Sequence, residues 1–251
     1  MYIKIFSLFF CILINSSSPF QFSSSRIIKR QPIKANIHGL DLGLVTVATG
    51  LVLDNTISKP SLEVLRNNSR ILYEEGMRKS YKNLLILGPS YYYGVEKFLI
   101  HDFNSNPELL QILGILAIHS IGYYSAHRTM HRNKLFRKYH YFHHQFNDTL
   151  VPSIGNAVSE FEFTLAYMLP FVVSVIILNP NAISLDIGIM IVSIMNLIIH
   201  CQELENVKWN EYFVAPKTHL YHHQSKNNYS TYSAPTFNLE NIGGKLKKLI
   251  F

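Results

Sequence analysis

The chain has 251 residues, a length typical of a single domain, and 48% of them are hydrophobic while only 16% are charged. This composition, with a mean hydropathy of only +0.10, predicts an integral membrane protein that carries a sizeable aqueous portion. The net charge of +7 does not indicate nucleic-acid binding, because the basic residues border apolar segments. The two cysteines, Cys11 and Cys201, lie in or beside apolar stretches, so neither a disulfide framework nor a thiolate metal site is predicted.

Residues 1–35 have the features of a targeting segment. They contain no Asp or Glu, and the apolar run Ile5–Ile14 has the length of a signal-peptide core but is too short to span a bilayer. The Ser-rich, basic continuation predicts a bipartite organelle signal, with an uncleaved interfacial N-terminus as the alternative. Residues 36–83 are predicted to form a polar and interfacial region, with a short apolar stretch at Leu40–Leu53 and a helix through Ser61–Leu65.

The remaining residues, 84–251, are predicted to form the catalytic domain. Its four apolar segments are Leu84–Ile100, Leu109–Ala126, Thr164–Leu178 and Ile183–Ile199. Asn and Pro occur in the turn between the first two segments and in the turn between the last two, so each pair is predicted to form a helical hairpin. The predicted fold is therefore all-α, with four main membrane helices. Residues 128–138 are rich in Lys and Arg whereas both turns lack them, which predicts that the histidine-rich part forms a cap on the cytosolic side.

Histidines recur in three groups with helical spacing. The groups are His127 and His131; His140, His143 and His144; and His219, His222 and His223. On a helix, residues three and four apart lie about 5–6 Å from each other, so each group projects from one face. Four imidazoles complete a tetrahedral zinc site, so eight indicate two metals or six-coordinate ones. Imidazole suits Zn, Cu, Fe and Ni alike, and the ligand type alone therefore does not choose the metal.

Four further histidines and three candidate glutamates lie outside the three groups. His200 ends the fourth apolar segment, beside Asn196, and is predicted to be a ninth ligand. His119 lies within the second apolar segment and is either functional or an interior residue held by hydrogen bonds. His38 and His101 lie in polar flanks and are predicted to be solvated. Three glutamates are candidates for hydrogen bonds that orient the imidazoles, and the sequence does not choose among Glu160, Glu162 and Glu203.

The three histidine groups resemble the boxes of the fatty acid hydroxylase/sterol desaturase superfamily of membrane di-iron enzymes. The matching stretches are His127-Arg128-Thr129-Met130-His131, His140-Tyr141-Phe142-His143-His144 and His219-Leu220-Tyr221-His222-His223, supported by Tyr124, by Asn196 with His200, and by Asn228-Tyr229. The similarity covers roughly residues 84–245. The chain departs from the family at Ser120, where an acidic residue is common, at Ser125, where Trp is frequent, and at 157–162, where sterol-type members carry a His-Pro pair.

The resemblance implies a centre of two iron ions held by histidines, with O2 as co-substrate. It further implies a membrane lipid of the sterol or fatty acyl type as substrate, and electrons from a cytochrome b5-type or NAD(P)H-linked donor protein. The implied location is the endoplasmic reticulum membrane. A plastid-like organelle membrane is the alternative if the N-terminal signal is cleaved.

The residues themselves also favour oxidation over hydrolysis. Hydrolytic metal sites keep three protein ligands and a water, often with a carboxylate base, whereas Thr129 and Met130 occupy the interior of the first box. An apolar substrate offers few hydrolysable bonds, and O2 activation is a task that proteins leave to metals. We therefore predict an O2-dependent lipid hydroxylase or desaturase, a non-haem di-iron monooxygenase. The alternatives are a zinc-dependent membrane hydrolase and a non-catalytic homologue with a structural metal site.

Overall fold

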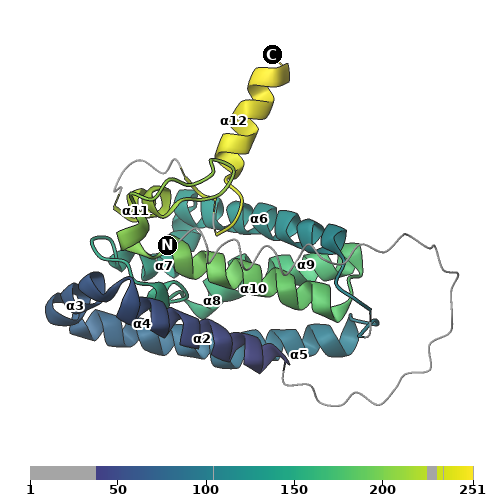
Figure 1. The fold of residues 1–251 in the computed structure, drawn as a ribbon, viewed down its shortest axis with the longest axis horizontal. Helices are drawn as coiled ribbons and strands as arrows, with labels where there is room; N and C mark the ends of the chain where they lie inside the picture. Colours follow the sequence, from purple (N-terminus) through teal and green to yellow (C-terminus); the bar gives the residue numbers. More distant parts are fainter. Residues whose placement is uncertain (1–37, 104, 225–230, 234, 251) are drawn as a thin grey trace, which may run out of the picture. The chain divides into compact units, whose positions relative to one another are not determined.

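The computed structural model describes residues 38–103, 105–224, 231–233 and 235–250, which form helices and their connecting loops (Figure 1). No β-strand occurs among these residues, and their one isolated bridge joins Phe213 and Phe237. The all-α prediction is confirmed for this part of the chain. The predicted targeting segment, residues 1–35, lies outside the described residues.

Three helices of the described chain are long and apolar enough to cross a membrane. They are α6 (Leu109–Arg132), a continuous helix over Glu160–Leu178, and α10 (Ala182–Ile199). The second of them comprises α8 (Glu160–Glu162), the π-helix η4 (Phe163–Met168) and α9 (Leu169–Leu178). Three of the four predicted apolar segments are thus confirmed as candidate spans.

The first predicted segment, 84–100, is helical but is not among these candidates. It consists of the π-helix η1 (Asn83–Leu87) and α5 (Gly88–Phe98), and it continues the charged helix α4 (Arg70–Lys82). The apolar part is therefore short. A further candidate is the pair α2 (His38–Thr56) and α3 (Lys59–Asn68), which is bent by 91° and gives a fourth span if counted as one.

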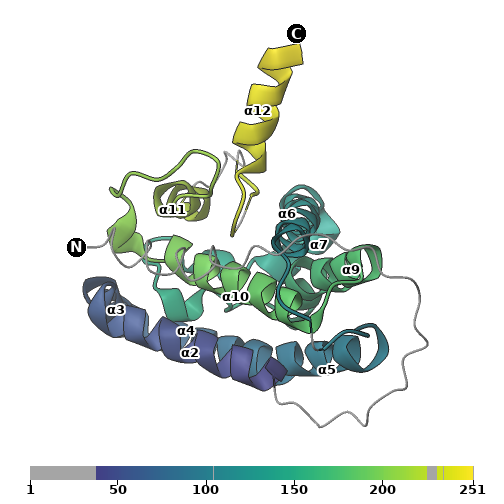
Figure 2. The ribbon, with the colours of Figure 1, turned by 45° about the vertical axis from the view of Figure 1, so that its right-hand side comes forward.

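The predicted pairing of the helices into two hairpins is not confirmed. Among the long helices, α6 packs against α9 and α10, while α2 packs against α5 and α10 (Figures 1 and 2). Glycines allow α6 to lie close to α9 and α10. A Cβ added at Gly122 of α6 would lie 2.8 Å from Pro170 of α9, and a Cβ added at Gly188 of α10 would lie 2.8 Å from Ile115 of α6. Membrane helices approach each other where small residues allow it. The positions of these glycines, and not the order of the helices along the chain, therefore decide which helices are neighbours.

The ends of the membrane helices carry local stop and start signals. Asn179 follows α9 in the left-handed conformation, with φ of 45°, and Asn is one of the few residues that adopt it at little cost. The Asn181 side chain then accepts a hydrogen bond from the Ser184 backbone N–H at 2.8 Å and caps α10. At the other end, Asn133 separates α6 from α7 by capping the shorter helix through the Leu135 N–H.

Short helices gather at one end of the long ones and carry six of the 12 histidines. They are α7 (Lys134–His140), η2 (His143–Gln145), η3 (Pro152–Ile154), η5 (Gln202–Leu204) and α11 (Pro216–Gln224). The last helix, α12 (Leu239–Ile250), extends away from this group (Figures 1 and 2). A buried apolar cluster that includes Tyr73, Phe146, Ile154 and Leu220 joins α4 and α11 to the loop that follows η2.

Candidate metal centre

The structure brings all nine predicted histidines into two groups. The first contains His127, His131, His140, His144 and His222; the second contains His143, His200, His219 and His223. Within each group the candidate ligand atoms lie within 4.8 Å of one another. The groups adjoin, since the rings of His144 and His223 stack at 4.7 Å between centroids. All nine side chains are buried except His144, which is half-buried.

The two His-x-x-His-His boxes each contribute to both groups. In the second box, His140 and His144 join the first group while His143 joins the second; in the third box, His219 and His223 join the second group while His222 joins the first. The spacing of the histidines predicts instead that each box projects from a single face. On an α-helix, however, a step of four residues turns about 40° one way and a step of three about 60° the other. The i, i+4 pair therefore faces one group and the remaining histidine faces the other.

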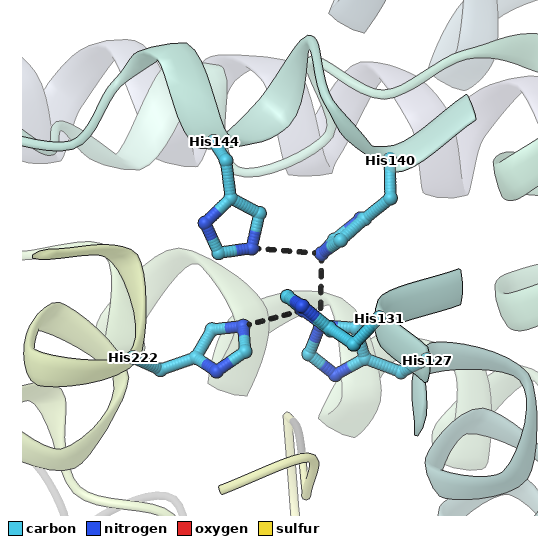
Figure 3. A group of neighbouring side chains, drawn as sticks. All are labelled: His127, His131, His140, His144 and His222. Atoms are coloured by element: carbon cyan, nitrogen blue, oxygen red, sulfur yellow. Dashed lines mark hydrogen bonds between the residues drawn. The ribbon is translucent and has the colours of Figure 1, made fainter. Parts of the chain in front are cut away.

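The Nε2 atoms of the first group converge at distances that suit a shared metal. Nε2 of His127 lies 2.9 Å from that of His140 and 3.1 Å from that of His131 (Figure 3). Nε2 of His131 is 3.1 Å from that of His222, and His144 approaches His140 at 2.9 Å. Ligand atoms about 2.0–2.1 Å from one metal are separated from each other by about 2.9 Å at right angles and about 3.4 Å in a tetrahedron.

Hydrogen bonds on the opposite side of the rings fix where the protons lie. The carbonyl of Tyr232 accepts from His127 Nδ1 at 2.9 Å, and the carboxylate of Glu162 accepts from His140 Nδ1 at 2.6 Å. Because these acceptors hold the imidazole proton on Nδ1, both Nε2 atoms carry lone pairs. Two lone pairs that face each other at 2.9 Å repel unless a cation lies between them.

In the second group, a hydrogen bond likewise holds the proton of His200 on Nδ1. Its Nδ1 donates to the carbonyl of Asn196 at 2.6 Å, which leaves a lone pair on Nε2. That Nε2 lies 3.0 Å from Nε2 of His219 and 3.4 Å from Nε2 of His143. His223 completes the group, with its Nε2 at 3.2 Å from that of His219.

Burial holds the imidazoles outside the candidate spans in the neutral form. It lowers the pKa of His144 and of His200 to about 4. For the others, burial and then the neighbouring imidazoles lower the pKa well below its ordinary value; these are His140, His143, His219, His222 and His223. Neutral imidazole is the form that binds a metal ion, so the cluster is ready to coordinate near neutral pH.

Of the three candidate glutamates, only Glu162 contacts an imidazole. Glu160 pairs with Lys82, and Glu203 accepts a hydrogen bond from the Ser61 hydroxyl at 2.6 Å. The Ser159 hydroxyl accepts from the Glu162 N–H at 3.2 Å and so starts the helix that carries Glu162. A carboxylate bound to the far nitrogen of a ligating histidine orients the ring and raises its basicity.

Two residues near the centre were not found from the sequence. Tyr232 contributes a backbone carbonyl, which any residue type offers, so no sequence signal marks it. Gly155 lies against the second group, where an added Cβ would be 3.0 Å from His200 Nδ1 and 3.1 Å from Asn196 Nδ2. A side chain at this position would require His200 or Asn196 to move by a few tenths of an ångström. The family match at Asn228-Tyr229 lies outside the described residues.

The other histidines lie away from both groups. His119 is fully buried in α6, with its ring 4.3 Å from that of Phe171 and 6.2 Å from that of Tyr123 between centroids. It therefore belongs to the aromatic packing among the membrane helices. His38 and His101 are exposed, as predicted.

An apolar cavity lies beside the second group. It is lined by residues of α2, α5, η1, η4, α9 and α10, among them Leu84, Phe163, Tyr167 and Asn196. Asn196 connects the cavity to the centre, because its carbonyl holds His200. Both π-helices contribute to the walls, and such distortions of a helix are frequent at functional sites.

Comparison with known proteins identifies the family. Residues 112–240 match the family model described as fatty acid hydroxylase. The matched region is more than half of the 251 residues and contains all nine histidines of the two groups, so the chain belongs to the fatty acid hydroxylase family. The comparisons with curated proteins and with solved structures found no match.

Proposed function

We propose that this protein is a membrane-bound di-iron oxidoreductase that uses O2 to hydroxylate or desaturate a lipid of the sterol or fatty acyl type. The observation that carries the proposal is the convergence of imidazole lone pairs in two adjoining groups, within a chain of the fatty acid hydroxylase family. The nine histidines in those groups are the proposed metal ligands.

The donor set fits iron better than a closed zinc site. Structural zinc takes four ligands, whereas the first group offers five imidazoles. The second group offers four imidazoles, so the two groups could together hold two iron ions, which would supply the chemistry of O2. Neither group includes a cysteine or a carboxylate among its ligand atoms.

The residues of the chain have separate tasks in the proposed reaction. The iron ions, when bound, supply the activation of O2 that side chains cannot provide. Glu162 and the carbonyl groups of Tyr232 and Asn196 hold the imidazole protons away from the metal side. Met130, which lies between the two histidines of the first box in sequence, is fully buried and packs in an apolar cluster with Val158 and Phe163. The apolar cavity next to Asn196, with a volume of about 70 Å³, offers an apolar surface for one part of the lipid.

The proposed reactions need a reductant as well as O2. Hydroxylation inserts one oxygen atom into a C–H bond and reduces the other to water, with two electrons and two protons. Desaturation removes two hydrogen atoms from the lipid and forms two molecules of water with the same input. A cytochrome b5-type or NAD(P)H-linked donor supplies the electrons.

The proposed location is the endoplasmic reticulum membrane, with the histidine groups toward the cytosol. Exposed Arg128, Arg132, Lys134, Arg137 and Lys138 surround the first and second boxes. Lys and Arg favour the cytosolic side of short membrane loops, and this bias supports the proposed orientation.

Metal analysis of the purified full chain tests the proposal. We expect iron at close to two ions per chain, and the new product in lipid extracts should carry an added hydroxyl or a new double bond. His143→Ala and His222→Ala belong to different groups, so each should remove metal from one site and abolish turnover. His101→Ala, an exposed histidine, is the control and should change neither. Zinc in place of iron, or full activity with either box variant, would overturn the proposal.

A further inference from the structure

A second pocket lies beside the metal centre and is lined by cations. Its walls are formed by Arg78, Lys79, Lys82 and Asn83 on one side and by Tyr139, Val158, Ser159, Glu160 and Phe161 on the other. The pocket has a volume of about 330 Å³, which is within the range of small-molecule sites. It is separate from the apolar cavity described above, which is lined by other residues.

The charges that line this pocket are not balanced. Three cations face one carboxylate, Glu160, which pairs with Lys82. Lys79 lies 3.5 Å from Glu75 and 4.6 Å from the centre of the Phe142 ring. Arg78 is exposed and forms no ion pair with any residue that the structure describes. Arg78 and Lys82 are also i, i+4 neighbours on α4, so an anion bound between them would contact both side chains.

The position of the pocket along the chain places it at the boundary of the bilayer. Glu160 is the first residue of a candidate membrane span, and Lys82 directly precedes the apolar η1 segment. The rings of Tyr139 and Phe161 stack at 4.2 Å between centroids and form one wall, and aromatic residues are enriched at this depth. A ligand in this pocket can therefore keep its polar end in water and its apolar part in the membrane.

We propose that the pocket formed by Arg78, Lys79 and Lys82 binds the anionic head group, a phosphate or carboxylate, of a membrane lipid. A guanidinium can bind two oxygens of such a group at once, and the ammonium groups add point charges. A membrane lipid fits better than a soluble anion, because the aromatic wall and the adjacent candidate span offer an apolar surface to its chains. The binding site does not depend on the proposed oxidation chemistry.

The test measures which lipids the full chain retains. The protein, purified in a neutral detergent, is incubated with phosphatidic acid or with diacylglycerol that has the same acyl chains, and retained lipid is counted by native mass spectrometry. We expect phosphatidic acid to be retained and diacylglycerol to be lost. Arg78→Gln/Lys82→Gln should lower the retention of phosphatidic acid by about tenfold, since two charge-assisted contacts are lost. The control, Arg128→Gln/Lys134→Gln, removes two exposed cations that do not line the pocket and should change retention by less than about twofold.

Each other outcome would overturn the inference. Equal retention of phosphatidic acid and diacylglycerol would show that the protein does not recognise the charge of the head group. An equal loss in both double variants would assign the effect to the net charge of the protein rather than to the pocket. Displacement of the lipid by millimolar inorganic phosphate would make the ligand a free anion and not a membrane lipid. Metal content, measured on the same samples, reports that the variants are folded.

Discussion

Replacing Glu162 by Gln tests how the chain positions a metal ligand. The Glu162 carboxylate accepts a hydrogen bond of 2.6 Å from His140 Nδ1. Both side chains are almost fully buried, with an exposed fraction of 0% for Glu162 and 3% for His140. Gln has nearly the same size and still offers an oxygen acceptor. The substitution therefore removes the charge of the acceptor and leaves the packing of the helix start in place.

The expected effect follows from the strength of the bond. A hydrogen bond to a charged group contributes about 1.5–3 kcal/mol and a neutral one about 0.5–1.5 kcal/mol, so the difference is about 1–1.5 kcal/mol. No discount for solvent screening is needed, because the pair is buried. Each 1.4 kcal/mol corresponds to about tenfold in an equilibrium constant, so metal affinity at the first group should fall by about tenfold. Glu162→Ala leaves the His140 N–H without a partner and should cost more, up to about a hundredfold.

Chelator titration of the purified full chain measures this effect. In Glu162→Gln, about one of the two irons should leave at a chelator concentration about tenfold lower than in the unchanged protein, while the second group should keep its iron. Glu160→Gln is the matched control: it lies two residues away, on the same helix, and contacts Lys82 and no imidazole. An unchanged titration curve for Glu162→Gln, or the same shift in both variants, would refute the assigned role of Glu162.

Three further predictions concern the second histidine group and the topology. His200→Gln should empty the four-histidine group, so that elemental analysis finds about one iron per chain and turnover falls more than about tenfold; retention of both metals with more than about a tenth of the activity would make His200 structural. Gly155→Ala should lower the iron content in the same assay, because its Cβ would crowd His200, whereas Gly243→Ala, which has nothing within 4 Å, should not. In sealed microsomes, a tag after the last residue should be accessible from the cytosolic side and a tag within Asn179–Ala182 should be protected; the opposite pattern would contradict the proposed orientation.

The helices themselves were largely predictable, and their partners were not. Asn and Pro after Leu178 and the apolar run to Ile199 defined the boundaries of α9 and α10 closely. The predicted assignment of neighbours is not confirmed, because it relied on chain order, whereas packing follows the points of closest approach, such as Gly122 against Pro170. In lipid, where all faces of these helices are apolar, the apolar pattern does not identify the contact face.

The candidate metal ligands were predictable from the sequence alone, since the spacing of the boxes and the position of His200 indicated all nine histidines that the structure groups together. How they divide between two sites was decided only by the tertiary structure. A box of the His-x-x-His-His form sits on about one helical turn, and that turn fixes the directions of its side chains relative to each other but not to the rest of the chain. The tautomers depend likewise on acceptors from distant segments, the Tyr232 carbonyl and the Glu162 carboxylate, which meet the rings only after α6, α7 and α8 have packed. Spacing along a chain sets local angles, whereas a metal site requires atoms from several segments to converge at one point.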